Sequence, residues 1–163
     1  PDVSWSSVHW REYRDLRRPQ ATLRADELEN FAFSSPDLAL SWTQISLNEE
    51  TNVEDAALDS LDAMYKLGIA GELIIINDGS SDGTREIAER LVAEDPRIRL
   101  INHSSPKGIG ASFMEGANNA ECDFVTMFPG DNENDPYDAL TYYYLTRDVD
   151  IIVPFIENIE VRS

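Results

Sequence analysis

The chain has 163 residues, enough for one folded core with a short appendage, and its hydrophobic fraction of 42% is ordinary for a globular domain. A formal net charge of -18 argues against nucleic acid as a partner, because a broad contact with phosphates would be repulsive. No apolar run approaches the roughly 20 residues that span a bilayer, and the N-terminus lacks the pattern of a signal peptide. We therefore expect no transmembrane segment and a cytoplasmic location.

Residues 1–36 are polar and irregular in pattern, and we interpret them as an N-terminal extension of a domain that covers 37–163. Within the extension the pattern predicts a short helix over 8–18 and a turn at 34–36. The pattern of these residues suggests no catalytic or ligand-binding role.

From Leu38 onward, short apolar runs alternate with segments of helical periodicity. The apolar runs predict five strands, at 38–45, 73–76, 98–101, 124–128 and 151–153. The periodic segments predict four helices. The first is capped by Asn52 and has Val53, Ala57, Leu61 and Met64 on one face. The second runs from a cap at Asp82 to Asp95, the third covers 111–120 with Phe113 and Ala117 inward, and the fourth runs from Pro136 to Tyr144.

Strands that alternate with helices at these lengths imply right-handed crossovers and a mostly parallel sheet covered on both faces. The predicted class is therefore α/β. Ligands of such open sheets bind beyond the carboxyl ends of the strands. The segments to search for a site are those that follow predicted strands: 46–51, 77–83, 102–110 and 129–135.

The segment after the second predicted strand carries the most information. It reads Asn77-Asp78-Gly79-Ser80-Ser81-Asp82-Gly83-Thr84. Glycines permit tight turns, and short Asn, Asp and Ser side chains present many hydrogen-bonding groups in a small space. Such a segment suits a polar ligand such as a nucleobase and ribose. The alternative is that Asp82 and Thr84 only start the next helix.

The run from Glu72 to Thr84 resembles the strand and loop signature of family 2 glycosyltransferases, which is usually written with two aspartates before Gly-Ser. Asn77 replaces the first aspartate. The resemblance implies that Asn77, Asp78 and the strand residue Ile75 take part in binding a nucleotide-sugar donor. In the family the first of these aspartates contacts the base, and an Asn there would keep the contact with altered hydrogen-bonding roles.

Upstream, the run from Ser41 to Glu50 resembles the opening strand and Asn-Glu-Glu loop of the same family. The resemblance implies donor contacts from Leu47, Asn48 and Glu49, although Leu47 stands where the family commonly has Tyr. Without the resemblance, Asn-Glu-Glu is equally well an acidic cluster at the start of a helix.

Downstream, the run from Lys107 to Gly116 resembles the segment after the family's third strand. Its Gly-x-Gly opens a helix, whose free N–H groups and positive dipole end could face a phosphate beside Lys107. The alternative is a tight connection that binds no ligand.

The run from Phe128 to Pro136 follows the fourth predicted strand, where the family has its Asp-x-Asp metal motif. Pro129 takes the place of the first aspartate. Asp131 matches the second, which the resemblance implies to be a direct metal ligand and thereby a catalytic residue. Glu133 is a second candidate ligand, because Mg²⁺ and Mn²⁺ prefer carboxylate and diphosphate oxygens. The alternative is a surface acidic loop that caps the next helix.

Together these matches cover roughly residues 38–153. They imply a GT-A fold, a Rossmann-like and mostly parallel sheet with helices on both faces, here truncated at its C-terminal side. The implied reaction is an inverting transfer of sugar from a UDP- or GDP-linked donor to an acceptor, assisted by Mg²⁺ or Mn²⁺. The run 108–113 leans toward the polyprenyl- or dolichyl-phosphate branch, whose acceptor is a lipid phosphate. The location would then be the inner face of a membrane, and Arg162 would begin an acceptor-binding segment.

Two other functions remain open. The chain is alternatively a nucleotide-sugar-binding module or inactive fragment without turnover, because Pro129 removes one carboxylate of the metal motif. An unrelated flavodoxin-like or dinucleotide-binding domain shares the architecture, but its phosphate loop would follow the first strand. The donor hypothesis requires that Asn77 and Asp131 lie at one edge of the sheet.

Overall fold

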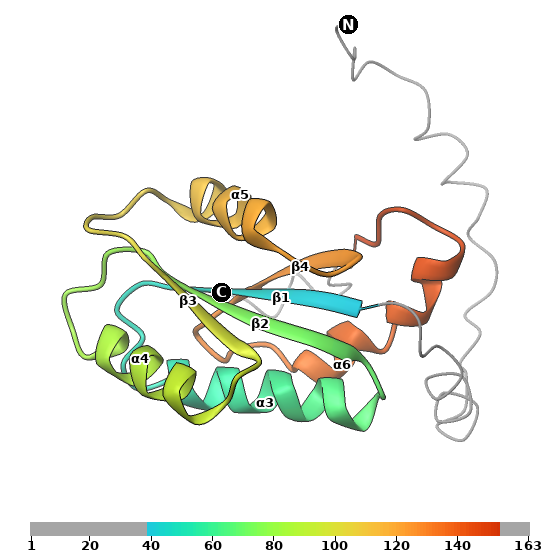
Figure 1. Ribbon diagram of the computed structural model, residues 1–163, viewed down its shortest axis with the longest axis horizontal. Helices are drawn as coiled ribbons and strands as arrows, with labels where there is room; N and C mark the ends of the chain where they lie inside the picture. The colour runs from blue at the N-terminus through green and yellow to red at the C-terminus, as the bar shows by residue number, and fades with distance from the viewer. Residues whose placement is uncertain (1–38, 154–163) are drawn as a thin grey trace, which may run out of the picture.

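The computed structural model of the chain describes residues 39–153. The predictions for the extension 1–36, including its helix and turn, and for Arg162 lie outside these described residues. Within them a parallel sheet carries helices on both of its faces (Figure 1). No helix in this part of the chain is long and apolar enough to cross a membrane.

Four parallel strands form the sheet in the order β3-β2-β1-β4. Their bounds are Ala39–Ser46 for β1, Ala70–Asn77 for β2, Ile98–Asn102 for β3 and Phe124–Pro129 for β4. The run Leu73–Ile76 is fully buried, as expected of a central strand covered on both faces. The first four predicted strands are confirmed.

The helices divide between the two faces of the sheet (Figure 1). On one face lie α3 (Val53–Lys66), α4 (Thr84–Glu94) and the short α6 (Pro136–Leu140), and on the other lies α5 (Ile109–Asn119). The crossovers through α3 and α4 proceed outward from β1 to β3, whereas the crossover through α5 returns past β1 to β4. Because each crossover is right-handed, this reversal puts α5 on the opposite face.

The main core lies between the sheet and α3. Val53, Ala57, Leu61 and Met64 are buried, as the helical periodicity predicts. Trp42 of β1 contributes the largest buried side chain, and its ring centroid lies 4.6 Å from that of Phe128 on β4. This contact ties the edge strand that precedes Asp131 to the centre of the sheet.

Helix α5 packs differently from the prediction. The expected inward residues Phe113 and Ala117 are only partly buried, whereas Ser112 and Gly116 are buried. A Cβ atom on Gly116 would lie 2.7 Å from Ile76 Cδ1 and 2.9 Å from a methyl group of Thr43. The helix lies so close to the sheet that only small residues fit between them, and apolar periodicity alone therefore selected the wrong positions.

The helix starts also differ in detail from the prediction. Asn52 occupies the N-cap position of α3, but its side chain donates to Glu49 and makes no cap bond to the helix. Gly83, not Asp82, is the N-cap residue of α4, although the Asp82 carboxylate accepts from the Thr84 N–H at 3.1 Å. The fourth predicted helix is shorter, because α6 ends at Leu140 and a separate 3₁₀ helix, Tyr143–Arg147, follows.

The fifth predicted strand is wrong. Residues 151–153 form no strand, and the side chains of Ile151 and Val153 are 63% and 76% exposed. A short apolar run forms a strand only where it can pair with the edge of a sheet. Among the described residues, no strand pairs with 151–153.

We predict that Gly116→Val lowers the free energy of unfolding by about 1–3 kcal/mol, because the added atoms overlap with Ile76 and Thr43 in a packed layer. Gly110→Val is the matched control in the first turn of the same helix, where a Cβ meets no atom within 4 Å. Its effect should be within about 0.5 kcal/mol. Urea unfolding of both variants measures the difference, and equal effects would contradict the close approach of α5.

Candidate functional site

The four segments identified from the sequence converge on one edge of the sheet. The register pairs Asn102 with Asn77, and Asn77 with Ser46. On the other side of β1, the N–H of Gly130 donates to the carbonyl of Ile45 at 2.9 Å. Asp131 and Asn77 therefore follow or end strands that are separated only by β1, and both lie at the carboxyl edge.

The loop after β1 is bonded to the loop after β2. Asn48 adopts a positive φ of 58°, and its side-chain oxygen accepts from the Ser81 N–H at 2.9 Å. The N–H of Asn48 donates to Ser80 Oγ at 2.9 Å, and the N–H of Glu49 donates to Thr84 Oγ1 at 2.8 Å. Asn48 and Glu49, two predicted donor contacts, thus connect the two loops to each other.

The other predicted donor contacts, one just after β1 and two within β2, differ in how exposed their side chains are. Leu47 is 42% exposed at the carboxyl edge, whereas the Ile75 side chain is fully buried in the hydrophobic core. Asn77 is 2% exposed; its amide donates to Asn102 Oδ1 at 3.0 Å and its oxygen accepts from the Ser80 N–H at 3.2 Å. The side chains of Ile75 and Asn77 therefore act as internal supports of the edge.

Asp78 is a buried side chain at the edge, 3% exposed, and its carboxylate is hydrogen-bonded on both oxygens. Its Oδ1 accepts from the Lys107 N–H at 2.8 Å and lies 2.6 Å from His103 Nδ1, while its Oδ2 accepts from the Gly108 N–H at 2.9 Å. Burial alone would raise the pKa of Asp78, but the hydrogen bonds from His103 and the two N–H groups outweigh it and lower the pKa to about 2. Asp78 is therefore a buried anion that holds the segment after β3.

The segment 103–108 also lies against the glycine that follows Asp78. Gly79 has a φ of 77°, and a Cβ atom there would lie 2.5 Å from the carbonyl carbon of Ser105. The N–H of His103 donates to the Asn77 carbonyl at 2.9 Å. The loops after β1, β2 and β3 therefore form one hydrogen-bonded unit.

The predicted phosphate site at the start of α5 is partly filled by the protein itself. The backbone N–H groups of Lys107 and Gly108 point to Asp78, and the Lys107 ammonium lies 2.8 Å from Glu115 Oε2. The following N–H groups, of 109–111, lie in the first turn of the helix and have no intrahelical acceptor. These are the groups left for an external anion.

Sequence reasoning missed His103 and Glu115. The His103 side chain is only 1% exposed, and its Nε2 lies 3.1 Å from Glu115 Oε2. A lone His after an apolar run and a Glu within a helix match no motif. The signal that could have found them is topological, because His103 follows β3 and Glu115 is one helical turn and a half into the adjacent helix.

The acidic loop after β4 is less constrained than the other three. The Asp131 carboxylate accepts from the Glu133 N–H at 3.1 Å, and Asn132, at a φ of 55°, reaches Asp59 of α3 at 3.4 Å. Asp135 caps α6 by accepting from the Tyr137 N–H at 2.8 Å. The helix-capping alternative is thus correct for Asp135, but it does not involve Asp131 or Glu133.

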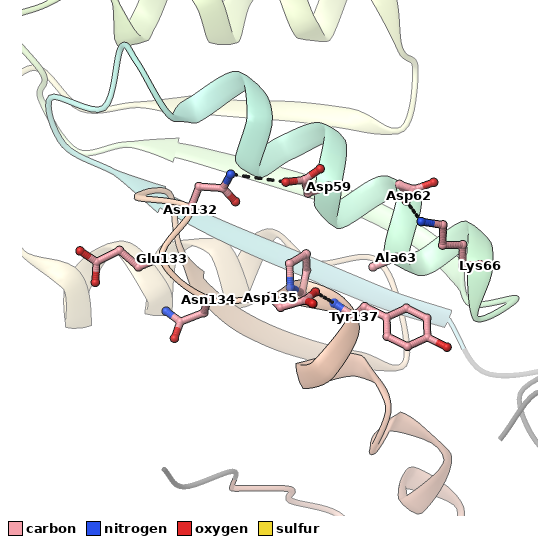
Figure 2. A pocket seen from close by; sticks show the side chains of 10 residues that line it. Asp59, Asp62, Ala63, Lys66, Asn132, Glu133, Asn134, Asp135 and Tyr137 are labelled. Atoms are coloured by element: carbon pink, nitrogen blue, oxygen red, sulfur yellow. Dashed lines mark hydrogen bonds and ion pairs between the residues drawn. The ribbon is translucent and has the colours of Figure 1, made fainter. Parts of the chain in front are cut away.

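An open groove of about 750 Å³ lies between α3 and this loop (Figure 2). Acidic groups dominate its lining, with Asp59 and Asp62 on α3 and Asp135 on the loop, and Lys66 is paired with Asp62. In Figure 2 the Glu133 carboxylate points away from α3. The groove therefore does not suit an anionic ligand.

The described residues alone do not complete a metal site. Within 39–153, no group of three or more His, Cys, Asp and Glu side chains is arranged to hold a metal ion. Asp131 is half-buried and Glu133 is exposed, and in this range no cation pairs with either carboxylate. Two carboxylates suit Mg²⁺ or Mn²⁺ when diphosphate and water oxygens supply the other ligands.

We predict that Asp78→Asn lowers the free energy of unfolding at pH 7 by about 1–3 kcal/mol, because an amide cannot accept from all the donors that surround this carboxylate. The folded-state pKa of Asp78, about 2, lies below the ordinary value of 3.8, so its contribution is complete above pH 3.8 and is lost as the pH falls toward 2. Urea unfolding at pH 7 and pH 3 should show a smaller difference at the lower pH. Asp148→Asn, on the exposed surface, is the control and should change little at either pH.

Comparison with known proteins agrees with the resemblance noted in the sequence. A dolichyl-phosphate beta-glucosyltransferase of Trichomonas vaginalis is 35% identical over 60 residues, which are 37% of this chain and 18% of that protein. The chain thus spans less than a fifth of the length of this relative.

Solved structures show the fold. A mannosyltransferase from Pyrobaculum calidifontis has a TM-score of 0.56 at 19% identity, over 83% of this chain and 38% of its own. Glucosyl-3-phosphoglycerate synthase of Mycobacterium tuberculosis has a TM-score of 0.57 at 19% identity, over 76% of this chain and 46% of its own. The predicted GT-A architecture is confirmed. Residues 45–161 match the family model described as glycosyl transferase family 2, and the chain therefore belongs to that family.

Proposed function

We propose that this chain is the nucleotide-sugar-binding part of an inverting glycosyltransferase, which transfers a sugar from a UDP- or GDP-linked donor to an acceptor. The observation that supports the proposal most is the convergence of four family segments on one sheet edge, with Asp131 across β1 from the Asn77 loop. A ligand that touches both sides must extend along this edge, as a nucleotide joined to a diphosphate does.

The donor's nucleoside is assigned to the bonded unit formed by the loops after β1, β2 and β3. Leu47 and Asn48 are exposed there and available for contact with the nucleoside. Asn77 and Asp78 are buried, and their hydrogen bonds keep the loops in place. A pre-formed site of this kind loses little conformational entropy when it binds its ligand. The free N–H groups of 109–111 and the ammonium of Lys107 would lie toward the diphosphate.

Asp131 and Glu133 are the groups proposed to hold a divalent cation. Their carboxylates are unpaired by cations within 39–153, and hard oxygen ligands match Mg²⁺ and Mn²⁺. The related mannosyltransferase of known structure was obtained with GDP-mannose and Mn²⁺, which supports this choice. A bound cation would stabilise the negative charge that develops on the leaving diphosphate. Asp131 is the catalytic residue in this sense.

The acceptor is proposed to be a lipid phosphate, on the basis of similarity to a dolichyl-phosphate beta-glucosyltransferase. The acidic groove between α3 and the 132–137 segment is unsuitable for it, because Asp59, Asp62 and Asp135 would repel a phosphate. The acceptor must therefore approach the edge from another side. A cytoplasmic site at the inner face of a membrane is the corresponding location.

A second candidate is a nucleotide-sugar-binding module without turnover. It is favoured by Pro129, which replaces a family carboxylate, and by the finding that within 39–153 no group of three or more His, Cys, Asp and Glu side chains is arranged to hold a metal ion. Binding of the donor with no hydrolysis and no transfer to a polyprenyl phosphate would select the module.

We predict that UDP or GDP binds the chain more tightly in the presence of Mn²⁺, and that Asp131→Ala removes most of this metal-dependent gain. Loss of one carboxylate ligand should cost at least about tenfold in affinity. Isothermal titration calorimetry with and without Mn²⁺ measures the effect. Asp62→Ala removes the same charge from α3, which forms one wall of the groove, and should retain the metal dependence. Unchanged metal dependence in Asp131→Ala would remove this residue from its proposed role.

A further inference from the structure

His103 lies between two carboxylates. Its Nδ1 is 2.6 Å from Asp78 Oδ1, and its Nε2 is 3.1 Å from Glu115 Oε2. A neutral imidazole has one N–H and one lone pair, so it can donate to only one of two carboxylates. In the neutral form, the lone pair of the other nitrogen would face a carboxylate oxygen at one of these short distances.

The surroundings of Asp78 and Glu115 favour the ionised form of both carboxylates. Asp78 also accepts from two backbone N–H groups, and its pKa is about 2. The pKa of Glu115 is lowered, first of all by its hydrogen bond from Lys107. Ionised carboxylates only accept hydrogen bonds, so the geometry requires both ring nitrogens of His103 to donate.

The charges of the cluster lead to the same result. The charged groups that face His103 are Asp78 just after β2, Glu115 on α5, and Lys107, which pairs with Glu115. Two carboxylates and one ammonium leave an excess negative charge beside a ring that is 1% exposed. An imidazolium neutralises this charge, and buried charges are tolerated chiefly when they are paired in this way.

We propose that His103 is held as an imidazolium between Asp78 and Glu115 and is thereby a positioning residue, which fixes the segment 103–108 and the start of α5 for the donor's phosphates. The role in donor binding rests on the function proposed above. Asp78 is the shared acceptor, since the same carboxylate binds the ring and the N–H groups of Lys107 and Gly108. Loss of the ring proton would turn a lone pair toward a carboxylate and weaken this connection.

The charge state can be measured without any ligand. The chain has two histidines, His9 and His103, so imidazole ¹⁵N NMR spectra contain two sets of signals, which His103→Asn assigns. We expect His103 to carry protons on both nitrogens at pH 7. In Glu115→Gln the amide can donate to a neutral ring, so the His103 signals at pH 7 should move toward those of a singly protonated ring. Glu86→Gln, an exposed change of the same charge on α4, should leave the His103 signals at pH 7 unchanged.

The positioning role is tested by nucleotide binding against pH. In the wild-type chain, affinity for GDP or UDP with Mn²⁺ should fall by about fivefold or more between pH 7 and a pH at which the ¹⁵N spectrum shows only one protonated ring nitrogen in His103. The amide of His103→Asn can still donate to Asp78 and does not titrate, so the variant should fold and should lack this fall. Titration of the nucleotide phosphate itself affects both proteins equally.

The outcomes separate the two proposals. A neutral His103 at pH 7 would overturn the inference, and so would identical pH profiles of binding in the wild-type chain and His103→Asn. If His103 is doubly protonated but no nucleotide binds at any pH, the proposed function fails together with the donor role, while the charge state stands.

Discussion

The arrangement of the site depends on the hydrogen bonds that the buried Asp78 carboxylate accepts. Asp78 directly follows a strand that is buried on both faces, and its carboxylate accepts from the two backbone N–H groups that lead into α5 and from the ring of His103. An isolated buried carboxylate is unfavourable, so its burial here requires all of these donors together. The Asp78 anion therefore fixes the position of α5 relative to β2. The adjacent Gly79 lies directly against the segment that follows β3.

The carboxyl edge consequently has a constrained part and an open part. The loops after β1, β2 and β3 are cross-linked by side-chain to backbone bonds, in which Asn48, Thr84 and Asp78 take part. The loop after β4 is bonded mainly to itself and, through Asn132, to α3. This division suits the proposed function, in which the constrained loops would hold a nucleoside and the open loop would adapt to a diphosphate and a cation.

The strands and the class of fold were predictable because their causes are local. The continuous apolar run of β2 indicates a strand buried on both faces, and the apolar spacing of α3 selects one face of that helix. The inward face of α5 was not predictable from apolar spacing, because the distance between helix and sheet decides that Ser112 and Gly116 face inward. The apolar run 151–153 failed as a strand for a similar reason, since pairing depends on a neighbour that the run itself does not specify.

The candidate site was predictable in its location but not in its internal bonding. Motif order placed Asn77 and Asp131 on loops that meet at one edge, but it could not show that the Asn77 side chain is buried against Asn102. His103 and Glu115 were missed because their association arises from the crossover between β3 and α5, not from their spacing. Residues that position others are found through contacts, whereas residues that carry a motif are found through the sequence.

The connection between β4 and Asp131 sets a limit on how this edge can change. Gly130 donates to the carbonyl of Ile45, and any Cβ atom at Gly130 would lie 2.0 Å from Ser46 Oγ. Pro129 before it has a fixed φ, which restricts the backbone conformations at the entry to the acidic loop. Insertions beyond Glu133 could therefore enlarge or reshape the groove next to α3 over evolutionary time, while the backbone that carries Asp131 keeps its place beside β1.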